Sequence, residues 1–175
     1  MVQGSLALDT VPLILSVPLP LLMAIHTLRS SQILRATPQQ CWDFFSDPRN
    51  LSKITPPDMG FIVKSKLPPR IHAGMMIEYR VSPLLGIPMT WLTEITQVRE
   101  GEYFVDEQRV GPYAIWHHEH RFNDLGDGRV EMNDIVTYVL PFSPFSEIVH
   151  PILVKPQLDK IFAYREKVVA QMFGP

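Results

Sequence analysis

The feature that most constrains the fold of this chain is a long amphipathic segment near its C-terminal end, from about Pro144 to Phe173. Apolar side chains recur at helical spacing in its second half and form one stripe: Leu158, Ile161, Phe162, Val168, Val169 and Met172. The charged residues Asp159, Lys160, Glu166 and Lys167 fall largely on the other side. A single helix with one apolar face needs an apolar surface to pack on, which the rest of the chain must supply.

Much of the preceding chain alternates apolar and polar residues, which is the pattern of β-strands with one buried face. A first strand is predicted at His26–Arg35, and six more follow: Gly60–Lys66, Met75–Ser82, Met89–Arg99, Tyr103–Val110, Ala114–Asn123 and Arg129–Leu140. Short turns that contain glycine, such as Glu100-Gly101, join them. Sequential strands with short connections predict an antiparallel meander.

Two short helices are predicted between the first and second strands. Thr37-Pro38 has the chemistry of an N-cap followed by a first-turn proline, and the segment PQQCWDFFSD then buries Trp42 and Phe45. Asp47 caps a second short helix, PRNLSKIT, which ends before Pro56-Pro57. The expected fold is therefore α+β, with an antiparallel seven-stranded sheet wrapped around the long C-terminal helix.

Composition narrows the class of protein. The 175 residues suffice for one hydrophobic core, and a net charge of -2 gives no reason to expect a nucleic-acid partner. The single cysteine, Cys41, excludes an internal disulfide and a cysteine-based zinc site, and it is expected to be buried on the first helix.

Residues 1–22 form an apolar, proline-rich segment unlike the rest of the chain. The apolar run Val11–Ile25 is too short to span a bilayer, so we expect no stable membrane insertion. A signal peptide is the alternative, but no Lys or Arg precedes the run and Asp9 stands where a positive charge belongs. We interpret residues 1–22 as a tail and 23–175 as the folded domain of a cytoplasmic protein.

The order of the elements resembles the helix-grip fold of START-type and plant pollen-allergen-type proteins. Three stretches, CWDFFSDPRNLSKITPPDMGF, GIPMTWLTEI and FVDEQRVGPYAIWHHEHRF, more closely resemble the bacterial SRPBCC family of polyketide cyclase/dehydrase-like proteins. The likeness covers about residues 24–173. It implies a cavity between the sheet and the C-terminal helix that holds a lipid, a polyketide, a hormone or another apolar ligand, with catalysis in only some members.

Alternation along each strand assigns the side chains that face such a cavity, with the face richer in large apolar residues taken as the inner one. The predicted inward residues are Met75, Ile77, Tyr79, Val81, Met89, Trp91, Thr93, Ile95, Trp116, His118, His120, Phe122, Met132, Asp134, Val136, Tyr138 and Leu140. The residues predicted to contact a ligand are Tyr79, Trp91, Gln108, Trp116, His118, His120, Tyr138 and Phe162.

The length of one hairpin loop decides whether a carboxylate joins this face. If Gly111-Pro112-Tyr113 forms a three-residue loop, Asp106 lies opposite His118. If the loop contains only Gly-Pro, Val105 and Glu107 face inward and Asp106 faces solvent.

The next hairpin offers a second carboxylate. With a turn at Asp124–Gly128 and Phe122 opposite Val130, Asp134 also lies opposite His118. Two flanking carboxylates raise the pKa of the imidazole, whereas burial lowers it. Such a group can act as a general acid or base, orient the polar end of a ligand, or belong to a buried structural network.

The candidate catalytic residues are therefore His118, Asp106 and Asp134. No metal site is expected, although His118 and His120 share a face and Asp106 can add an oxygen, because the sequence has no helical ligand pair such as HExxH. The GxSxG, P-loop and GxGxxG motifs are absent, and no cofactor is expected.

The leading interpretation is a module that binds a small hydrophobic or amphipathic molecule, because the inner face mixes aromatic residues with a few polar groups. The alternatives are a cofactor-independent cyclase or dehydratase with His118 as the acid/base, and a regulatory interaction module.

Overall fold

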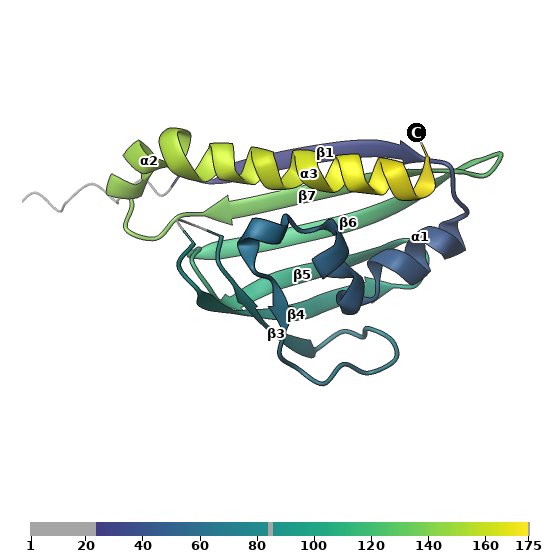
Figure 1. Ribbon diagram of the computed structural model, residues 1–175, viewed down its shortest axis with the longest axis horizontal. Helices are drawn as coiled ribbons and strands as arrows, with labels where there is room; N and C mark the ends of the chain where they lie inside the picture. The colour runs from purple at the N-terminus through teal and green to yellow at the C-terminus, as the bar shows by residue number, and fades with distance from the viewer. Residues whose placement is uncertain (1–23, 84–85, 175) are drawn as a thin grey trace, which may run out of the picture.

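One antiparallel sheet forms the frame of the molecule, and a long helix lies along one face of it (Figure 1). The computed structural model describes residues 24–83 and 86–174, so the tail predicted over residues 1–22 lies outside the described residues. The strand order is β1-β7-β6-β5-β4-β3-β2. The strands are β1 (His26–Leu34), β2 (Ile62–Val63), β3 (Met75–Val81), β4 (Met89–Arg99), β5 (Tyr103–Val110), β6 (Ile115–Gly126) and β7 (Arg129–Val139).

The helices follow from local capping chemistry. Helix α1 (Pro38–Phe45) starts with a capping box, in which the Thr37 hydroxyl accepts from the Gln40 backbone and the Gln40 side chain accepts from the Thr37 backbone. Asp47 caps the 3-10 helix η1 (Pro48–Ile54), and a further 3-10 turn, η2, covers Pro57–Met59.

The C-terminal helical stretch has three parts. A short helix α2 (Phe145–Val149) continues through a π-helical turn η3 (His150–Val154) into α3 (Lys155–Phe173). The predicted helix-grip architecture, a seven-stranded sheet with a long C-terminal helix and two short helices after the first strand, is confirmed.

The second predicted strand is much shorter than expected. Only Ile62–Val63 pairs with β3 as a strand. In a longer ladder the Glu78 N–H would donate to a backbone carbonyl, but here it donates to the Ser65 hydroxyl. The prolines that follow at Pro68-Pro69 offer no N–H to continue the pairing.

The register between β5 and β6 is the one that a three-residue loop predicts, with Asp106 opposite His118. Strand pairing ends at Glu107 and His117. Beyond it, the Gln108 side chain donates to the Tyr113 carbonyl at 2.7 Å and closes the hairpin.

The predicted register between β6 and β7 is wrong by two residues. Asp127 and Gly128 both have positive φ, as a two-residue type I′ turn requires, so β6 continues to Gly126 instead of ending at Asn123. Phe122 therefore faces Met132, and Asp134 faces His120 instead of His118. A shift of two positions keeps every side chain on its face, so Asp134 still points inward.

The core consists of two apolar clusters. One gathers around Trp42, whose ring meets those of Phe104 and Phe122 edge to face, and the other gathers Trp116 and Tyr138 against α3. Leu158, Phe162 and Val169 of α3 are buried, as the stripe predicts, and Ile161 and Val168 are half-buried. Met172 was wrongly placed in this stripe: it is 46% exposed.

Cys41 is a free, buried thiol, as expected, and burial raises its pKa to about 11. Within the ranges that the structure describes, none of the helices is long and apolar enough to cross a membrane.

Candidate functional site

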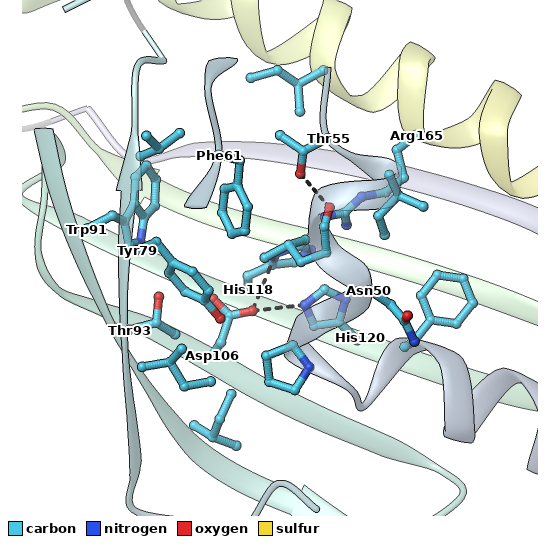
Figure 2. A pocket seen from close by; sticks show the side chains of 18 of the residues that line it. Asn50, Thr55, Phe61, Tyr79, Trp91, Thr93, Asp106, His118, His120 and Arg165 are labelled. Carbon is cyan, nitrogen blue, oxygen red and sulfur yellow. Dashed lines mark hydrogen bonds and ion pairs between the residues drawn. The ribbon is translucent and has the colours of Figure 1, made fainter. Parts of the chain in front are cut away.

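A cavity of about 170 Å³ lies between the inner face of the sheet, helix α3 and the η1 segment (Figure 2). Most of its lining is apolar or aromatic, including Ile77 and Tyr79 of β3, Trp91 of β4 and Phe162 of α3. An engineered apolar cavity of about 150 Å³ binds benzene, so this space holds about one aromatic ring.

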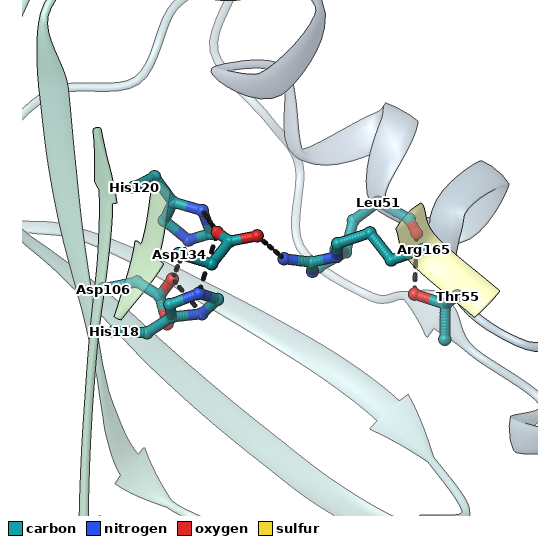
Figure 3. Close-up of polar contacts among 7 residues, drawn as sticks. All are labelled: Leu51, Thr55, Asp106, His118, His120, Asp134 and Arg165. Atoms are coloured by element: carbon teal, nitrogen blue, oxygen red, sulfur yellow. Dashed lines mark hydrogen bonds and ion pairs between the residues drawn. The ribbon is translucent and has the colours of Figure 1, made fainter. Parts of the chain in front are cut away.

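Five polar side chains from four elements form one cluster, and four of them lie in the wall of the cavity while Asp134 lies behind it. They are Asp106 on β5, His118 and His120 on β6, Asp134 on β7 and Arg165 on α3 (Figure 3). The strand register places the first four on the inner face, and the helix supplies the fifth from the opposite side. The exposed fraction of the side chain is 18% for Asp106, 5% for His118, 8% for His120 and 5% for Asp134. Water therefore screens the charges of this cluster little.

The two imidazole rings lie between the two carboxylates. His118 Nε2 is 3.1 Å from Asp134 Oδ1, and His120 Nε2 is 2.9 Å from Asp106 Oδ2. The remaining nitrogens are close to the opposite carboxylates: His118 Nδ1 is 3.7 Å from Asp106 Oδ2, and His120 Nδ1 is 2.8 Å from Asp134 Oδ1 without the alignment of a hydrogen bond. The ring centroids are 3.8 Å apart.

Arg165 adds a positive charge to the cluster. Its Nη1 lies 3.4 Å from Asp134 Oδ2, while its guanidinium stands 5.2 Å from the centre of the Phe162 ring. Burial acts to raise the pKa of Asp134, but Arg165 and the two imidazoles outweigh it and hold that pKa well below its usual range.

The two histidines have different pKa values for physical reasons. Burial lowers the pKa of His118, the charge of His120 lowers it further, and contacts with Asp134 and Asp106 do not offset these effects. Burial also acts to lower the pKa of His120, but its contacts with Asp106 and Asp134 outweigh burial and raise that pKa. Burial is therefore the larger of the two opposing effects expected on the pKa of His118. His120 is protonated more readily than His118.

The structure brings most of the predicted site residues to the cavity. The predicted ligand-contacting residues that line it are Tyr79, Trp91, Trp116, His118, His120 and Phe162, together with the candidate catalytic residue Asp106. Asp134 does not line it but supports both imidazoles.

Two of the predicted ligand-contacting residues lie elsewhere. Gln108 closes the β5–β6 hairpin, as described above. Tyr138 belongs to the second apolar cluster, and its hydroxyl lies 2.7 Å from His150 Nε2. Neither Gln108 nor Tyr138 is among the residues that line the cavity, so the structure does not place them in contact with a ligand bound there.

Three polar residues that the sequence did not predict also line the cavity: Arg165 of α3, Asn50 of η1 and Thr55 at the C-terminal end of η1. A signal for Arg165 was available, because it falls at helical spacing between Phe162 and Val169 in the middle of the apolar stripe. A charged residue at such a position either reaches solvent or meets a buried partner, which here is Asp134.

The curved antiparallel sheet, the helix along it and the cavity between them define a helix-grip protein. No family model matches the sequence, and no curated protein matches it. Solved structures do match. The Zhui aromatase/cyclase from Streptomyces sp. R1128 has a TM-score of 0.68 and 11% identity, over 85% of this chain and 93% of that one.

Two further structures have the same fold. Norcoclaurine synthase from Thalictrum flavum has a TM-score of 0.64 and 12% identity, over 86% of this chain and 94% of that one. Protein Ms6760 from Mycobacterium smegmatis has a TM-score of 0.59 and 19% identity, over 83% and 92%. At these identities the comparisons show the fold, which is the helix-grip fold that the order of the elements resembles.

Proposed function

We propose that this protein binds a small, mainly apolar molecule, about one aromatic ring in bulk and carrying a hydroxyl or similar polar end, in the cavity between the sheet and α3. The observation that carries the proposal is the composition of the cavity wall, which is apolar and aromatic except where Asp106, His118 and His120 meet. Such a combination of an apolar lining and a few convergent polar groups is the usual composition of a ligand site.

The polar groups give the site a direction. Asp106 and the cavity-side nitrogens of the two imidazoles lie at one end, while Trp91 and Trp116, whose ring centroids are 5.4 Å apart, form an aromatic wall. A ligand with one polar end satisfies both regions at once. A fully apolar ligand offers no hydrogen bond to Asp106 or to the imidazoles, so it gains less binding free energy at this end of the cavity.

Two measurements test the proposal. Solvent extraction and native mass spectrometry of the purified chain show whether it carries a small molecule. Thermal unfolding in the presence of a cresol and of toluene then tests the polar end, because a ligand that binds only the folded state stabilises it by mass action. We expect the cresol to raise the melting temperature more than toluene does.

A pair of matched variants locates the binding site. Val81→Phe fills the cavity from β3, whereas Met76→Phe adds a similar side chain on the outer face of the same strand, where Met76 is 44% exposed. We expect Val81→Phe to abolish the stabilisation by cresol and Met76→Phe to retain it. Equal stabilisation of both variants, or none in the wild-type protein, would sink the proposal.

A second candidate function is cofactor-independent cyclisation or dehydration with His118 as the acid/base. It is favoured by the contact of 3.1 Å between His118 Nε2 and Asp134, which orients an imidazole in the wall of an apolar cavity. The test is loss of water from an aromatic β-hydroxy ketone, followed by absorbance of the enone. Equal rates with the wild-type protein and with His118→Gln contradict this candidate.

A further inference from the structure

Three potential ligand atoms converge at the polar end of the cavity. Asp106, His118 and His120 each offer one, and these atoms all lie within 4.8 Å of one another. Asp106 Oδ2 lies 2.9 Å from His120 Nε2 and 3.7 Å from His118 Nδ1. Ligands that bind one ion at about 2.0–2.1 Å in a tetrahedron are about 3.3–3.4 Å apart, and the two observed distances bracket that value.

The opposite side of both rings is already occupied. Asp134 Oδ1 lies 3.1 Å from His118 Nε2 and 2.8 Å from His120 Nδ1. Its other oxygen is 3.4 Å from Arg165, which keeps the carboxylate ionised. When His118 gives its Nε2–H to Asp134, the lone pair of its Nδ1 is left free on the side of Asp106. His120 Nε2 is aligned with Asp106 Oδ2, so a metal ion that displaces the proton between them meets three electron-rich atoms.

A carboxylate behind a ligating histidine is the arrangement that fixes the tautomer and increases the basicity of the imidazole in metal sites. Here a single carboxylate lies against both rings (Figure 3): Asp134 Oδ1 is hydrogen-bonded to His118 Nε2 and lies 2.8 Å from His120 Nδ1. From this geometry we propose that Asp106 Oδ2, His118 Nδ1 and His120 Nε2 bind one divalent first-row transition-metal ion, with Asp134 as the residue that positions both imidazoles.

The donor set defines the class of ion. Two imidazoles and one carboxylate suit Zn²⁺, Fe²⁺ or Co²⁺, whereas Mg²⁺ and Ca²⁺ prefer oxygen ligands alone. Three protein ligands leave a position open, as in catalytic zinc sites, and all three residues line the cavity.

The charge of the site indicates what occupies the open position. With neutral imidazoles, the two carboxylates and Arg165 leave one net negative charge, and a divalent ion changes it to one net positive charge. A hydroxide, or a phenolate or carboxylate of a ligand, restores neutrality in this buried place. The metal site does not depend on the organic ligand proposed above, so the two proposals can fail separately.

The direct test uses the full-length chain, treated with a chelator, dialysed and titrated with Zn²⁺ in a calorimeter. We expect one ion per chain. Co²⁺ as a probe should give the intense visible absorption of a four- or five-coordinate ion, in contrast to the weak absorption of the six-coordinate hydrated ion. In the wild-type protein, Zn²⁺ should perturb the ring NMR signals of His118 and His120. This measurement needs no substitution, so it does not depend on the folding of a variant.

Variants distinguish this site from other histidines. Asp134→Asn should weaken Zn²⁺ binding by about 10–100-fold, as loss of a supporting carboxylate does elsewhere, and Asp106→Asn should weaken it more. His117→Gln is the matched control, because His117 is the neighbour on the outer face of β6, 33% exposed and paired with Glu107. His150→Gln controls for the stacked His26–His150 pair at the end of the sheet.

Three results overturn the proposal. They are the absence of binding at one ion per chain in the wild-type protein, Zn²⁺ binding that Asp106→Asn leaves unchanged, and loss of binding in either control variant. If the protein binds cresol but no Zn²⁺, the proposed metal site is rejected and the proposed ligand site is retained.

Discussion

Helices α1 and α2 lie at opposite ends of α3 (Figure 1), and the side chains at these two ends pack differently. At the α1 end, Trp42, Phe45 and Phe122 interlock with Phe173 from the end of α3, with neighbouring ring centroids 5.4 to 6.2 Å apart. At the α2 end, most of the large apolar side chains of α2 and η3 stay in contact with solvent: Phe145, Ile148, Val149 and Ile152.

A polar stack lies beside the second apolar cluster at the α2 end. The His26 ring lies 3.7 Å from that of His150, and its Nε2 is 2.9 Å from Glu147. His150 in turn contacts the Tyr138 hydroxyl. The interlocked aromatic rings at the α1 end therefore contribute more to stability than the exposed side chains of α2 and η3, whose substitution should cost little.

The largest expected effect is at the α1 end. Trp42→Ala should destabilise the protein by about 3–5 kcal/mol, because Trp42 is buried and the rings of Phe104 and Phe122 lose their shared contact. Denaturant-induced unfolding measures it. A cost below about 1 kcal/mol would mean that the aromatic cluster does not carry the stability assigned to it.

Phe162→Ala tests the middle of α3. Phe162 is 8% exposed, but it faces a cavity that already exists, so fewer contacts are lost than in a filled core. We expect a cost of about 3 kcal/mol, at the lower end of the range for such substitutions, measured by the same unfolding method. A cost equal to or above that of Trp42→Ala would contradict the assigned order.

His150→Gln tests the polar stack at the α2 end. The substitution should cost about 1 kcal/mol near neutral pH, because the contact with the Tyr138 hydroxyl is lost. Burial, followed by the charge of His26, lowers the pKa of His150 below its ordinary value of 6.5, while Glu147 opposes the shift.

The sign of the resulting pH dependence follows from linkage. The unfolded chain takes up a proton on His150 before the folded protein does, so wild-type stability is lost as the pH falls below 6.5 toward the lower pKa of the folded state. The His150→Gln variant should therefore lose less stability than the wild-type protein as the pH falls below 6.5. Parallel stability curves for the two proteins between pH 7 and about 5 would show that His150 is not shifted.

The smallest expected effect is that of Phe145→Ala. Phe145 is 76% exposed, so little apolar contact is lost, and the change in the free energy of unfolding should stay within about 0.5 kcal/mol. A loss of several times that size in urea unfolding would show that this surface is covered in solution.

Local patterns were enough to predict most of the fold. The bounds of β4 and β5 are those expected, because period-two alternation and glycine turns are visible in a single stretch of sequence. The pairing of Asp106 with His118 is the one that a three-residue loop predicts, which was one of the two alternatives that the sequence left open. These features depend on neighbouring residues only.

Features that depend on backbone conformation or distant contacts were less accessible. The β6–β7 register required knowing that Asp127 adopts a positive φ, which residue type alone does not dictate. Arg165 joins the site through its contact with Asp134 on β7, which lies 31 positions earlier in the chain. In a single sequence, an arginine within a helical stripe is most simply assigned to a solvated edge.

The place of β1 in the sheet has a consequence for the order of folding. Its only strand partner in the described structure is β7, and His26 and Tyr138 pair although more than a hundred positions separate them. On the ribosome the first strand must therefore wait unpaired until almost the whole chain has been synthesised, and long-range closure of this kind is slow. Its mixed sequence, with Arg29, Ser30, Ser31 and Gln32 at the centre, suits a strand that spends that interval in water.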